Sequence, residues 1–311
     1  MIVVGLGIQG QKRKAVAGKA VVATVDPVHP DAQYRRIEEV PLESYDAALL
    51  CIPDEPKIAI IDYLLRHHKH LLVEKPLFAA NTSDLVRLEQ LAKENKTVCY
   101  TAYNHRFEPH FMRMKGLLDS GRLGEIYSVR MFYGNGTARL VRDSAWRDQG
   151  AGVLPDLGSH LLDTALFWFG KPFAGFQVSS ANAFENRAID HICFGTNDQP
   201  LLQFELSLLS WRNHFYADIQ AEKGSAHIQS LCKWGPSTFT VRDRKLPSGR
   251  PDEESITLVE PDPTWELEYV HFKNLCKDSQ QSHGNLQNDI WINNTLQELT
   301  HTLDQRALIP K

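Results

Sequence analysis

The residues Gly5-Leu6-Gly7-Ile8-Gln9-Gly10 constrain the fold of this chain more than any other stretch. They follow Ile2-Val3-Val4 directly, so a glycine-rich turn comes after an apolar run that is long enough for a short buried strand. A Gly-x-Gly-x-x-Gly sequence in this position is typical of the first strand-to-helix turn of a dinucleotide-binding fold. The first glycine allows a tight turn, the second lets a pyrophosphate approach the backbone, and the third lets the helix lie close to the strand. The pyrophosphate is then expected at a helix N-terminus, on free N–H groups and the positive dipole end.

Apolar strands and amphipathic helices alternate through the first third of the chain. We expect strands at residues 2–4, 20–25, 45–52, 70–73 and 97–103, and helices at 11–19, 56–68 and 82–95, the last of them capped by Asn81 or Thr82. Strands separated by helices indicate a parallel sheet with right-handed crossovers. The prediction is a Rossmann domain, a doubly wound parallel sheet, over residues 1–103.

The second predicted strand ends on Asp26, where an acidic side chain can accept hydrogen bonds from the adenosine ribose of a dinucleotide and favour NAD. The structural alternative is that Asp26 only begins an Asp-Pro turn into Pro27. NADP also stays open, because Arg35 and Arg36 lie nearby in the sequence and are able to meet a phosphate.

The fourth predicted strand, Leu71-Leu72-Val73, runs directly into Glu74-Lys75-Pro76. Proline fixes its own φ and restricts the residue before it, and X-Pro bonds are the ones that adopt cis at modest cost. We predict that this joint holds the Lys75 ammonium at the carboxyl end of the sheet, where ligands bind in open α/β folds. The alternative is an exposed lysine at the start of a loop. The predicted cofactor-binding residues are Gly5, Gly7, Ile8, Gln9, Gly10, Asp26, Pro53, Glu74 and Lys75.

From residue 104 the pattern changes to long strands with few helices between them. We expect helices at 109–120, 156–169, 264–277 and 288–305, an alternating strand at 124–133, loops at 134–152 and 246–255, and further strands at 173–183, 189–195, 200–209, 214–221, 225–230 and 237–243. Such a run predicts a large open, mostly antiparallel sheet. Residues 104–311 are therefore predicted to form a second, substrate-binding and oligomerisation α/β domain, with a C-terminal helix able to pack back on the first domain.

The predicted helix at 156–169 places Asp156, His160 and Asp163 at positions i, i+4 and i+7, which share one helix face. Leucines surround these polar residues, as expected for a face that lines a cavity. The structural alternative, a capping aspartate and a hydrogen-bonded core histidine, explains the pattern equally well at this point.

Composition excludes several classes of protein. The 311 residues carry a net charge of −4 without a long basic block, which argues against nucleic acid or an anionic membrane as the main partner. No apolar run reaches the ~18 residues of a membrane span, and Met1 leads into the first strand without the basic segment of a signal peptide. The five cysteines are odd in number and dispersed along the chain, which predicts that their thiols are free. Free thiols favour a cytoplasmic protein, and the dispersed spacing predicts no structural metal site.

Taken together, these motifs resemble the Gfo/Idh/MocA oxidoreductases. The resemblance rests on the glycine turn, Glu74-Lys75-Pro76, Tyr103-Asn104-His105-Arg106-Phe107 and Asp156-x-Gly158-x-His160-x-x-Asp163, and it covers most of the chain. It implies NAD or NADP as cofactor, a sugar, inositol or related polyol as substrate, and a homodimer or homotetramer formed through the open sheet. It also implies that Lys75, Asp156 and His160 act at the substrate. A histidine that the family often carries after the third strand is replaced here by Lys57.

The hypothesis is therefore a dehydrogenase that transfers hydride between NAD(P) and a hydroxyl-bearing carbon. His160 is the expected acid/base, because its ordinary pKa of ~6.5 suits neutral pH. Lys75 is expected to stabilise charge on the reacting oxygen and Asp156 to orient either group. The predicted substrate contacts are Asn104, Arg106, Trp146, Arg147, Asp156 and His160, with Arg139 as a further candidate; Arg139 and Arg147 are equally well explained as surface residues.

Three other functions fit the same motifs. An NAD-dependent glycosidase would use a transient oxidation and show no net change in the cofactor. A non-enzymatic regulator would bind NAD(P) and a partner protein without turnover, and a biliverdin-reductase-like use of the fold is the most distant of the three.

Overall fold

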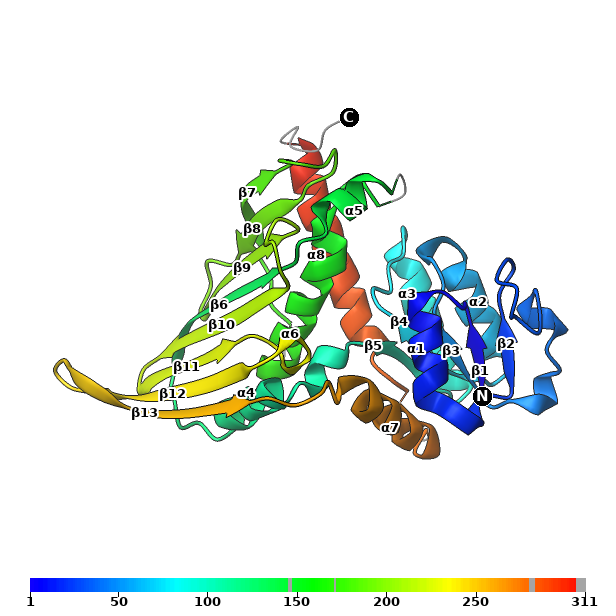
Figure 1. Cartoon of the computed structure of the whole chain (residues 1–311), viewed down its shortest axis with the longest axis horizontal. Coiled ribbons are helices and arrows are strands. Elements are labelled where there is room, and N and C mark those ends of the chain that lie inside the picture. The colour runs from blue at the N-terminus through cyan, green and yellow to red at the C-terminus, as the bar shows by residue number, and fades with distance from the viewer. Residues whose placement is uncertain (145–146, 171, 280–282, 306–311) are drawn as a thin grey trace. The chain divides into compact units, whose positions relative to one another are not determined.

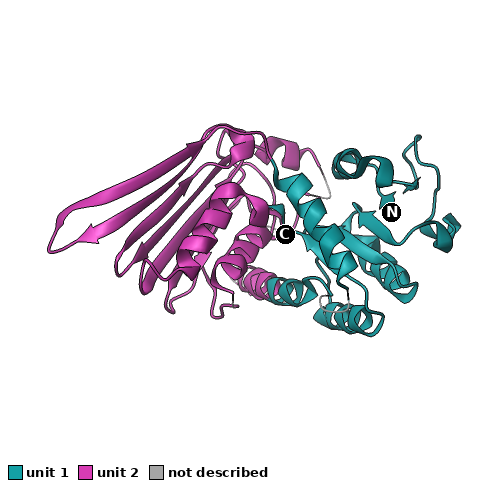
Figure 2. Cartoon of the chain, turned by 90° about the horizontal axis from the view of Figure 1, so that it is seen from below, with its two compact units in different colours: residues 1–104, 263–294 teal, residues 105–262, 295–311 magenta. Residues whose placement is uncertain are grey.

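The computed structural model describes all of the chain except residues 145–146, 171, 280–282 and 306–311. It contains two compact units, coloured separately in Figure 2: residues 1–104 with 263–294, and residues 105–262 with 295–311. Unit 1 thus includes a segment near the C-terminus, whereas the sequence analysis assigned everything after 103 to one domain. That the chain folds as two domains divided at residue 103 stays a prediction.

Unit 1 is built on a five-stranded parallel sheet with the strand order β2-β1-β3-β4-β5. Its strands are β1 (Ile2–Val4), β2 (Ala23–Val25), β3 (Ala47–Leu50), β4 (His70–Glu74) and β5 (Cys99–Ala102), and its helices include α1 (Ile8–Ala17), α2 (Asp54–Arg66), α3 (Thr82–Glu94) and α7 (Thr264–Lys277). The strand order reverses between β1 and β3, which is the point where open α/β sheets bind ligands. The predicted doubly wound parallel sheet is confirmed.

The two faces of this sheet are buried in separate cores because side chains alternate along each strand. Ile2 and Val4 of β1 belong to the core that contains Leu64 of α2 and Leu88 of α3. Val3 points the other way, into a core that contains Phe272 of α7. Three- to five-residue strands are buried almost completely in this arrangement, and the first four were recognisable in the sequence as apolar runs.

Unit 2 is built on an eight-stranded sheet with the order β13-β12-β11-β10-β6-β9-β8-β7, in which the β6–β9 pair is parallel and the others are antiparallel. Its strands are β6 (Ile126–Gly134), β7 (Gln177–Asn182), β8 (His191–Gly195), β9 (Leu201–Ser207), β10 (His214–Ala221), β11 (Gly224–Gln229), β12 (Ser237–Lys245) and β13 (Gly249–Leu258). The predicted large, mostly antiparallel sheet is confirmed.

Helices α4 (Pro109–Asp119) and α6 (Ser159–Phe169) lie along one face of this sheet (Figure 1). Phe111 of α4 packs 4.9 Å from the ring of Phe215 on β10, and the Trp168 indole of α6 donates a 3.2 Å hydrogen bond to the Phe111 carbonyl. On β8, β9 and β10 the residues that point the opposite way, such as Cys193, Glu205 and Tyr216, are only half-buried. One face of the sheet is therefore packed, and over these strands the other is open.

Three sequence predictions for this unit need correction. Residues 246–255 were predicted as a loop, but most of them belong to β13, which pairs antiparallel with β12. An edge strand exposed on both faces has no apolar alternation to reveal it, and ion pairs such as Arg242–Glu253 at 2.7 Å join it to its neighbour instead. The predicted loop 134–152 contains a short helix, α5 (Ala138–Arg142), and the predicted helix at 156–169 begins earlier, as a π-helical turn, Leu154–Gly158, that continues into α6.

Short 3₁₀ turns complete the described elements: Gly18–Ala20, Ile37–Glu39, Leu42–Ser44, Asn104–Phe107 and Cys232–Trp234. The last helix is α8 (Leu286–Gln305). Among the residues described, no helix combines the length and the apolar character that crossing a membrane requires.

Candidate functional site

The glycine turn between β1 and α1 has the geometry that its sequence predicts. Gly5 has φ +87°, and a Cβ on it would lie 2.2 Å from the Cys51 carbonyl oxygen; a Cβ on Gly10 would lie 1.8 Å from the Gly5 oxygen. A Cβ on Gly7 would meet nothing within 4 Å. Two glycines therefore allow close backbone packing, while the third leaves the backbone open before the first turn of α1, where a pyrophosphate would bind.

Asp26 at the end of β2 is buried and holds this turn in place. Its Oδ2 accepts a 2.8 Å hydrogen bond from the Leu6 N–H, and its Oδ1 accepts from the N–H groups of Val28 and His29 at 2.9 and 2.8 Å. Burial opposes ionisation, but these backbone hydrogen bonds outweigh it and lower the pKa of the Asp26 carboxyl. The carboxylate thus begins the Asp-Pro turn and is an ionised acceptor beside the glycine turn, so the two sequence readings are compatible.

The Glu74-Lys75-Pro76 joint follows β4 directly, and its Lys75–Pro76 peptide bond is cis. A buried lysine, Lys57 of α2, fixes the backbone on both sides of Lys75. The Lys57 ammonium donates to the carbonyl oxygens of Glu74 at 3.2 Å and Pro76 at 2.8 Å, and to Asp54 Oδ1 at 2.7 Å. Lys57 therefore uses all three of its N–H donors to hold the segment that carries Lys75.

The Glu74 side chain pairs with Arg13 of α1 at 2.6 Å, and the same guanidinium binds Glu268 of α7, also at 2.6 Å. The Arg13 guanidinium also lies 4.2 Å from the Trp265 ring centre. Although burial opposes its charge, the two carboxylates raise the pKa of Arg13 above its ordinary value. Glu74 thus has a structural partner that the sequence analysis did not predict, and its cofactor role stays a prediction.

In unit 2, the motif from Asp156 to Asp163 begins in the π-helical turn and ends in α6. Asp163 is buried and accepts hydrogen bonds of 2.6 to 3.1 Å from both Nε and Nη2 of Arg106. Burial raises the pKa of Asp163, and the Arg106 charge opposes that shift. Arg106, which was predicted to contact substrate, is therefore bound to Asp163 of the motif, and its contact with substrate stays a prediction. The π-helical turn at the start of the motif is a feature that occurs often at functional sites.

His160 lies in an aromatic cluster within unit 2. Its ring stacks on that of His105, 4.1 Å between centres, and meets the Tyr133 ring edge-on at 5.6 Å. The Lys233 ammonium lies 3.4 Å from His105 Nε2. Tyr133 comes from β6, where burial and, to a lesser extent, the charge of Asp156 raise the pKa of its phenol.

The other predicted site residues are distributed over both units. Pro53 precedes α2 at the end of β3, and Ile8 is exposed at the start of α1. Asn104 donates to Thr264 Oγ1 at 2.8 Å. Arg147 lies 3.9 Å from Asp156. Arg139 lies 3.6 Å from Glu185, and Trp146 is outside the described residues.

The three predicted catalytic residues lie in different units. Lys75 belongs to unit 1, and Asp156 and His160 belong to unit 2, so their meeting on one substrate stays a prediction.

Sequence reasoning missed the residues that support the predicted motifs in each unit. Arg13 and Lys57 are charged residues among the apolar positions of α1 and α2, and a charge on a buried helix face was the available signal. His105 lies inside the quoted motif at 103–107, and Tyr133 lies at the end of the alternating strand predicted at 124–133, one residue before the last residue of β6. Lys233 has no local signal, because it reaches His105 from a turn more than one hundred residues away.

A parallel sheet with an open glycine turn at its switch point, followed by a unit with a large open sheet, defines a dinucleotide-binding protein of two parts. The sequence models of two protein domains match: residues 2–103 match an oxidoreductase family with an NAD-binding Rossmann fold, and residues 111–227 match the GFO/IDH/MocA C-terminal domain. The chain belongs to the Gfo/Idh/MocA family of NAD(P)-binding oxidoreductases.

Two related proteins match this chain over part of its length. An uncharacterized oxidoreductase of Schizosaccharomyces pombe is 31% identical over 143 residues, 45% of this chain and 38% of the relative. Inositol 2-dehydrogenase of Rhizobium meliloti is 28% identical over 184 residues, 54% of each chain. The matched region thus spans less than two thirds of either relative.

Solved structures share the fold along almost the entire chain. Levoglucosan dehydrogenase, in complex with NADH, superimposes with a TM-score of 0.82 at 14% identity and covers 97% of this chain and 96% of its own. UDP-N-acetylglucosamine 3-dehydrogenase from Acidithiobacillus ferrooxidans does so with a TM-score of 0.79 at 15% identity, over 99% of this chain and 97% of its own.

Proposed function

We propose that this protein transfers hydride between NAD and a hydroxyl-bearing carbon of a sugar, an inositol or a related polyol. The observation that carries the proposal is His160, a titratable side chain buried in a ring cluster on the helix that bears the family's motif. Similar proteins that act on inositol, levoglucosan and a nucleotide sugar support the substrate class.

The choice of NAD over NADP rests on Asp26 and on the two arginines near it. An ionised Asp26 accepts hydrogen bonds from ribose hydroxyls and repels a 2′-phosphate. Arg35 donates to the carbonyl oxygens of Asp26 and His29 at 3.3 and 2.6 Å, and Arg36 pairs with Glu38 at 3.4 Å. Arg35 is therefore held against the backbone of the Asp26 turn, whereas the Arg36 side chain is exposed and has only a weak surface ion pair, so the preference for NAD rests mainly on Asp26.

The Rossmann unit fits the cofactor, because Gly7 leaves the backbone open where a pyrophosphate would approach. When bound, the nicotinamide supplies the hydride chemistry. His160 takes the proton of the substrate hydroxyl in oxidation and returns it in reduction. Lys75 donates a hydrogen bond to the reacting oxygen and stabilises the negative charge that develops there. Asp156 orients these groups and favours their charged forms.

We also propose that copies of this chain associate through the open face of the eight-stranded sheet. Phe132 and Tyr216 stack on that face, 5.4 Å between ring centres, and Arg130 lies 5.7 Å from the Tyr216 ring. Aromatic residues and arginine are enriched at protein interfaces. Sedimentation of the wild type and of Tyr216→Glu tests this: a dimer or tetramer should dissociate in the variant, and a monomeric wild type refutes the proposal.

A substrate screen tests the proposed activity. Inositols, pyranoses, anhydrosugars and nucleotide sugars are each incubated with NAD or NADP, and reduced cofactor is followed by absorbance. We expect reduction of NAD with at least one member of the panel, and a lower kcat/KM with NADP. Release of an aglycone without net reduction would indicate a glycosidase instead, and cofactor binding without any turnover would indicate a regulator.

A further inference from the structure

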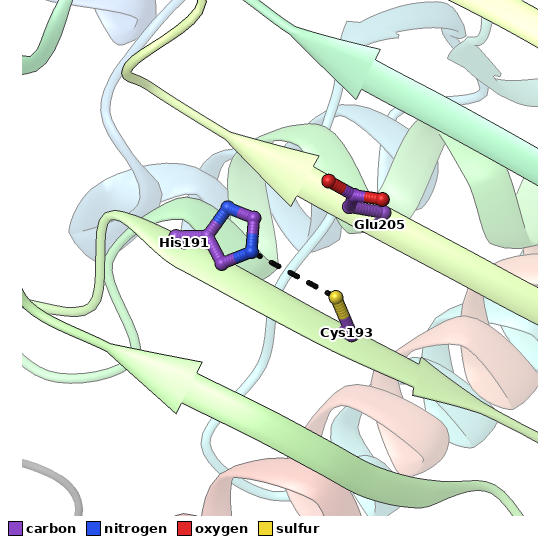
Figure 3. Close-up of side chains that lie close together, drawn as sticks. All are labelled: His191, Cys193 and Glu205. Atoms are coloured by element: carbon purple, nitrogen blue, oxygen red, sulfur yellow. Dashed lines mark hydrogen bonds between the residues drawn. The ribbon is translucent and has the colours of Figure 1, made fainter.

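Three side chains with metal-binding atoms lie together on the open face of the eight-stranded sheet, apart from the site motif on α6. They are His191 and Cys193 of β8 and Glu205 of β9, and all three are half-buried. Figure 3 shows the imidazole and the sulfur facing each other along one strand, with Glu205 beside them on the next. None of these residues has a part in the proposed hydride transfer.

The sheet itself brings the three residues together. His191 and Cys193 are two positions apart on a strand, so their side chains leave the same face. Cys193 is directly opposite Glu205 in the antiparallel β8–β9 pair. A cross-strand pair plus an i, i+2 neighbour places three side chains on one small area of the sheet surface without any loop. The dispersed cysteines predicted no structural metal site, because cysteine spacing alone does not reveal a histidine and a carboxylate that strand pairing brings beside one of them.

The distances suit a tetrahedral metal ion. One ligand atom of each residue lies within 4.8 Å of the other two, and His191 Nε2 is 3.8 Å from Cys193 Sγ. Zinc bonds of about 2.0–2.1 Å to nitrogen and about 2.3 Å to sulfur, at a tetrahedral angle, separate the two ligand atoms by about 3.6 Å. The nitrogen and sulfur are thus near the spacing that the ion requires, and a small rotation of the half-exposed Glu205 side chain completes the set.

Ligand chemistry selects the ion. A thiolate, an imidazole and a carboxylate together form the mixed soft and borderline set that zinc accepts, whereas Mg²⁺ and Ca²⁺ prefer oxygen alone. One neighbouring group opposes the ion: the Arg130 guanidinium lies 3.8 Å from Glu205, a weak ion pair that a bound metal would have to replace.

A route to the ligands is present. A surface hollow of about 330 Å³ is lined by Arg130, Gln177, Cys193, Gln203 and Glu205, so two of the three ligands border it.

We propose that His191, Cys193 and Glu205 bind one Zn²⁺ per chain. Binding replaces the thiol proton by a zinc–sulfur bond, and the proton leaves to the buffer. The ion links β8 to β9 and stabilises the folded unit by mass action.

Cobalt titration tests the site directly. Untagged full-length protein is stripped with chelator and titrated with Co²⁺, whose bond to a thiolate gives a charge-transfer absorption in the near ultraviolet. We expect one equivalent per chain, displaced by one equivalent of Zn²⁺. Cys193→Ser should abolish the absorption, and His191→Ala and Glu205→Gln should each weaken binding at least tenfold.

Matched controls separate the site from general effects. Cys276→Ser removes another half-buried thiol, and His227→Asn removes another histidine of the same sheet, which is paired with Asp218 at 2.6 Å. Both should keep wild-type cobalt binding.

Two further results are expected. Zinc should protect Cys193 from alkylation in the wild type, and Cys193→Ser should keep wild-type hydride transfer. A wild type that binds no stoichiometric metal, or an unchanged absorption in Cys193→Ser, overturns the proposal.

Discussion

At the scale of single residues, Lys57 is a buried charged residue that positions Lys75 through contacts with the backbone. Its ammonium binds the carbonyl oxygens on both sides of Lys75, so the position of Lys75, just after β4, depends on a residue of helix α2. Lys57 is a positioning residue in this account, because it contacts the backbone of the joint.

Lys57→Met should lower kcat by roughly tenfold while leaving KM for the substrate within about threefold, because the joint loses its two carbonyl contacts. Leaving buried carbonyl groups unpaired should also destabilise unit 1 by about 1–3 kcal/mol. Steady-state kinetics and thermal unfolding measure both effects, and Lys57→Arg should restore part of the activity. Lys69→Met is the matched control, since Lys69 donates to the Leu42 carbonyl at 2.7 Å and should affect stability alone. Equal kcat values in wild type and Lys57→Met would refute the positioning role.

Lys233 offers a second residue of this kind, through the His105 ring that stacks on His160. The Lys233 ammonium lies 3.4 Å from His105 Nε2, so it helps to hold the ring on which His160 stacks. Lys233→Met should therefore lower kcat several-fold while the KM for the substrate changes little, and Lys233→Arg should restore part of the loss. A kcat equal to that of the wild type in Lys233→Met would show that Lys233 has only a structural role.

At the scale of elements, the glycine turn separates packing from ligand binding. Gly7 has open space where a Cβ would point, whereas a Cβ on Gly10 would collide with the Gly5 carbonyl. Gly7→Ala should fold with nearly wild-type stability and weaken NAD binding about tenfold or more, because the methyl group occupies the approach of the pyrophosphate. Gly10→Ala should instead lower the melting temperature, since the backbone must shift. Fluorescence titration and thermal unfolding distinguish the two, and wild-type NAD affinity in Gly7→Ala would count against the assigned cofactor site.

The elements also show which parts of the fold the sequence can reveal. Buried strands such as β1 and β4 have continuous apolar runs, and the N-terminus of α3 is capped as predicted, with Asn81 accepting a 3.2 Å hydrogen bond from the Ser83 N–H. β13 was missed because an exposed edge strand is polar on both faces. The π-helical turn before α6 was missed because its residues fit an ordinary helix equally well.

The sequence likewise reveals some properties of the candidate site residues and not others. A motif identifies the residues, but it does not say which of their contacts are internal. Arg106 was predicted as a substrate contact, and its guanidinium also binds Asp163. Glu74 was predicted beside the cofactor, and it also pairs with Arg13. Both roles stay predictions. These partners are separated by about 57 and 61 positions in the sequence, a distance at which no local pattern reports a contact.

At the scale of the whole molecule, we expect folding to depend on pH through histidines that are buried wholly or in part. His70 accepts a 3.0 Å hydrogen bond from the Val98 N–H through Nδ1, and burial lowers its pKa below the ordinary 6.5. The folded chain therefore binds fewer protons than the unfolded chain. The stability that this group contributes is complete above about pH 6.5 and is lost as the pH falls through the lowered pKa of the folded state.

His70→Asn keeps an acceptor for the Val98 N–H but cannot titrate. Urea unfolding at pH 7.5 and pH 5.5 should show a smaller loss of stability in the variant than in the wild type. His110, whose pKa burial also lowers, accounts for part of the remaining slope. Equal losses in both proteins would show that His70 does not couple folding to pH.

The account as a whole depends on two residues from different units acting on one carbon. The measurement that tests this most directly is single-turnover hydride transfer with the best substrate of the screen, in wild type, Lys75→Met and His160→Ala, together with NAD affinity. We expect each variant to react roughly 10²–10⁴-fold more slowly while the Kd for NAD changes by less than about threefold. A near-normal rate in either variant would contradict the proposed chemistry and remove that residue from it.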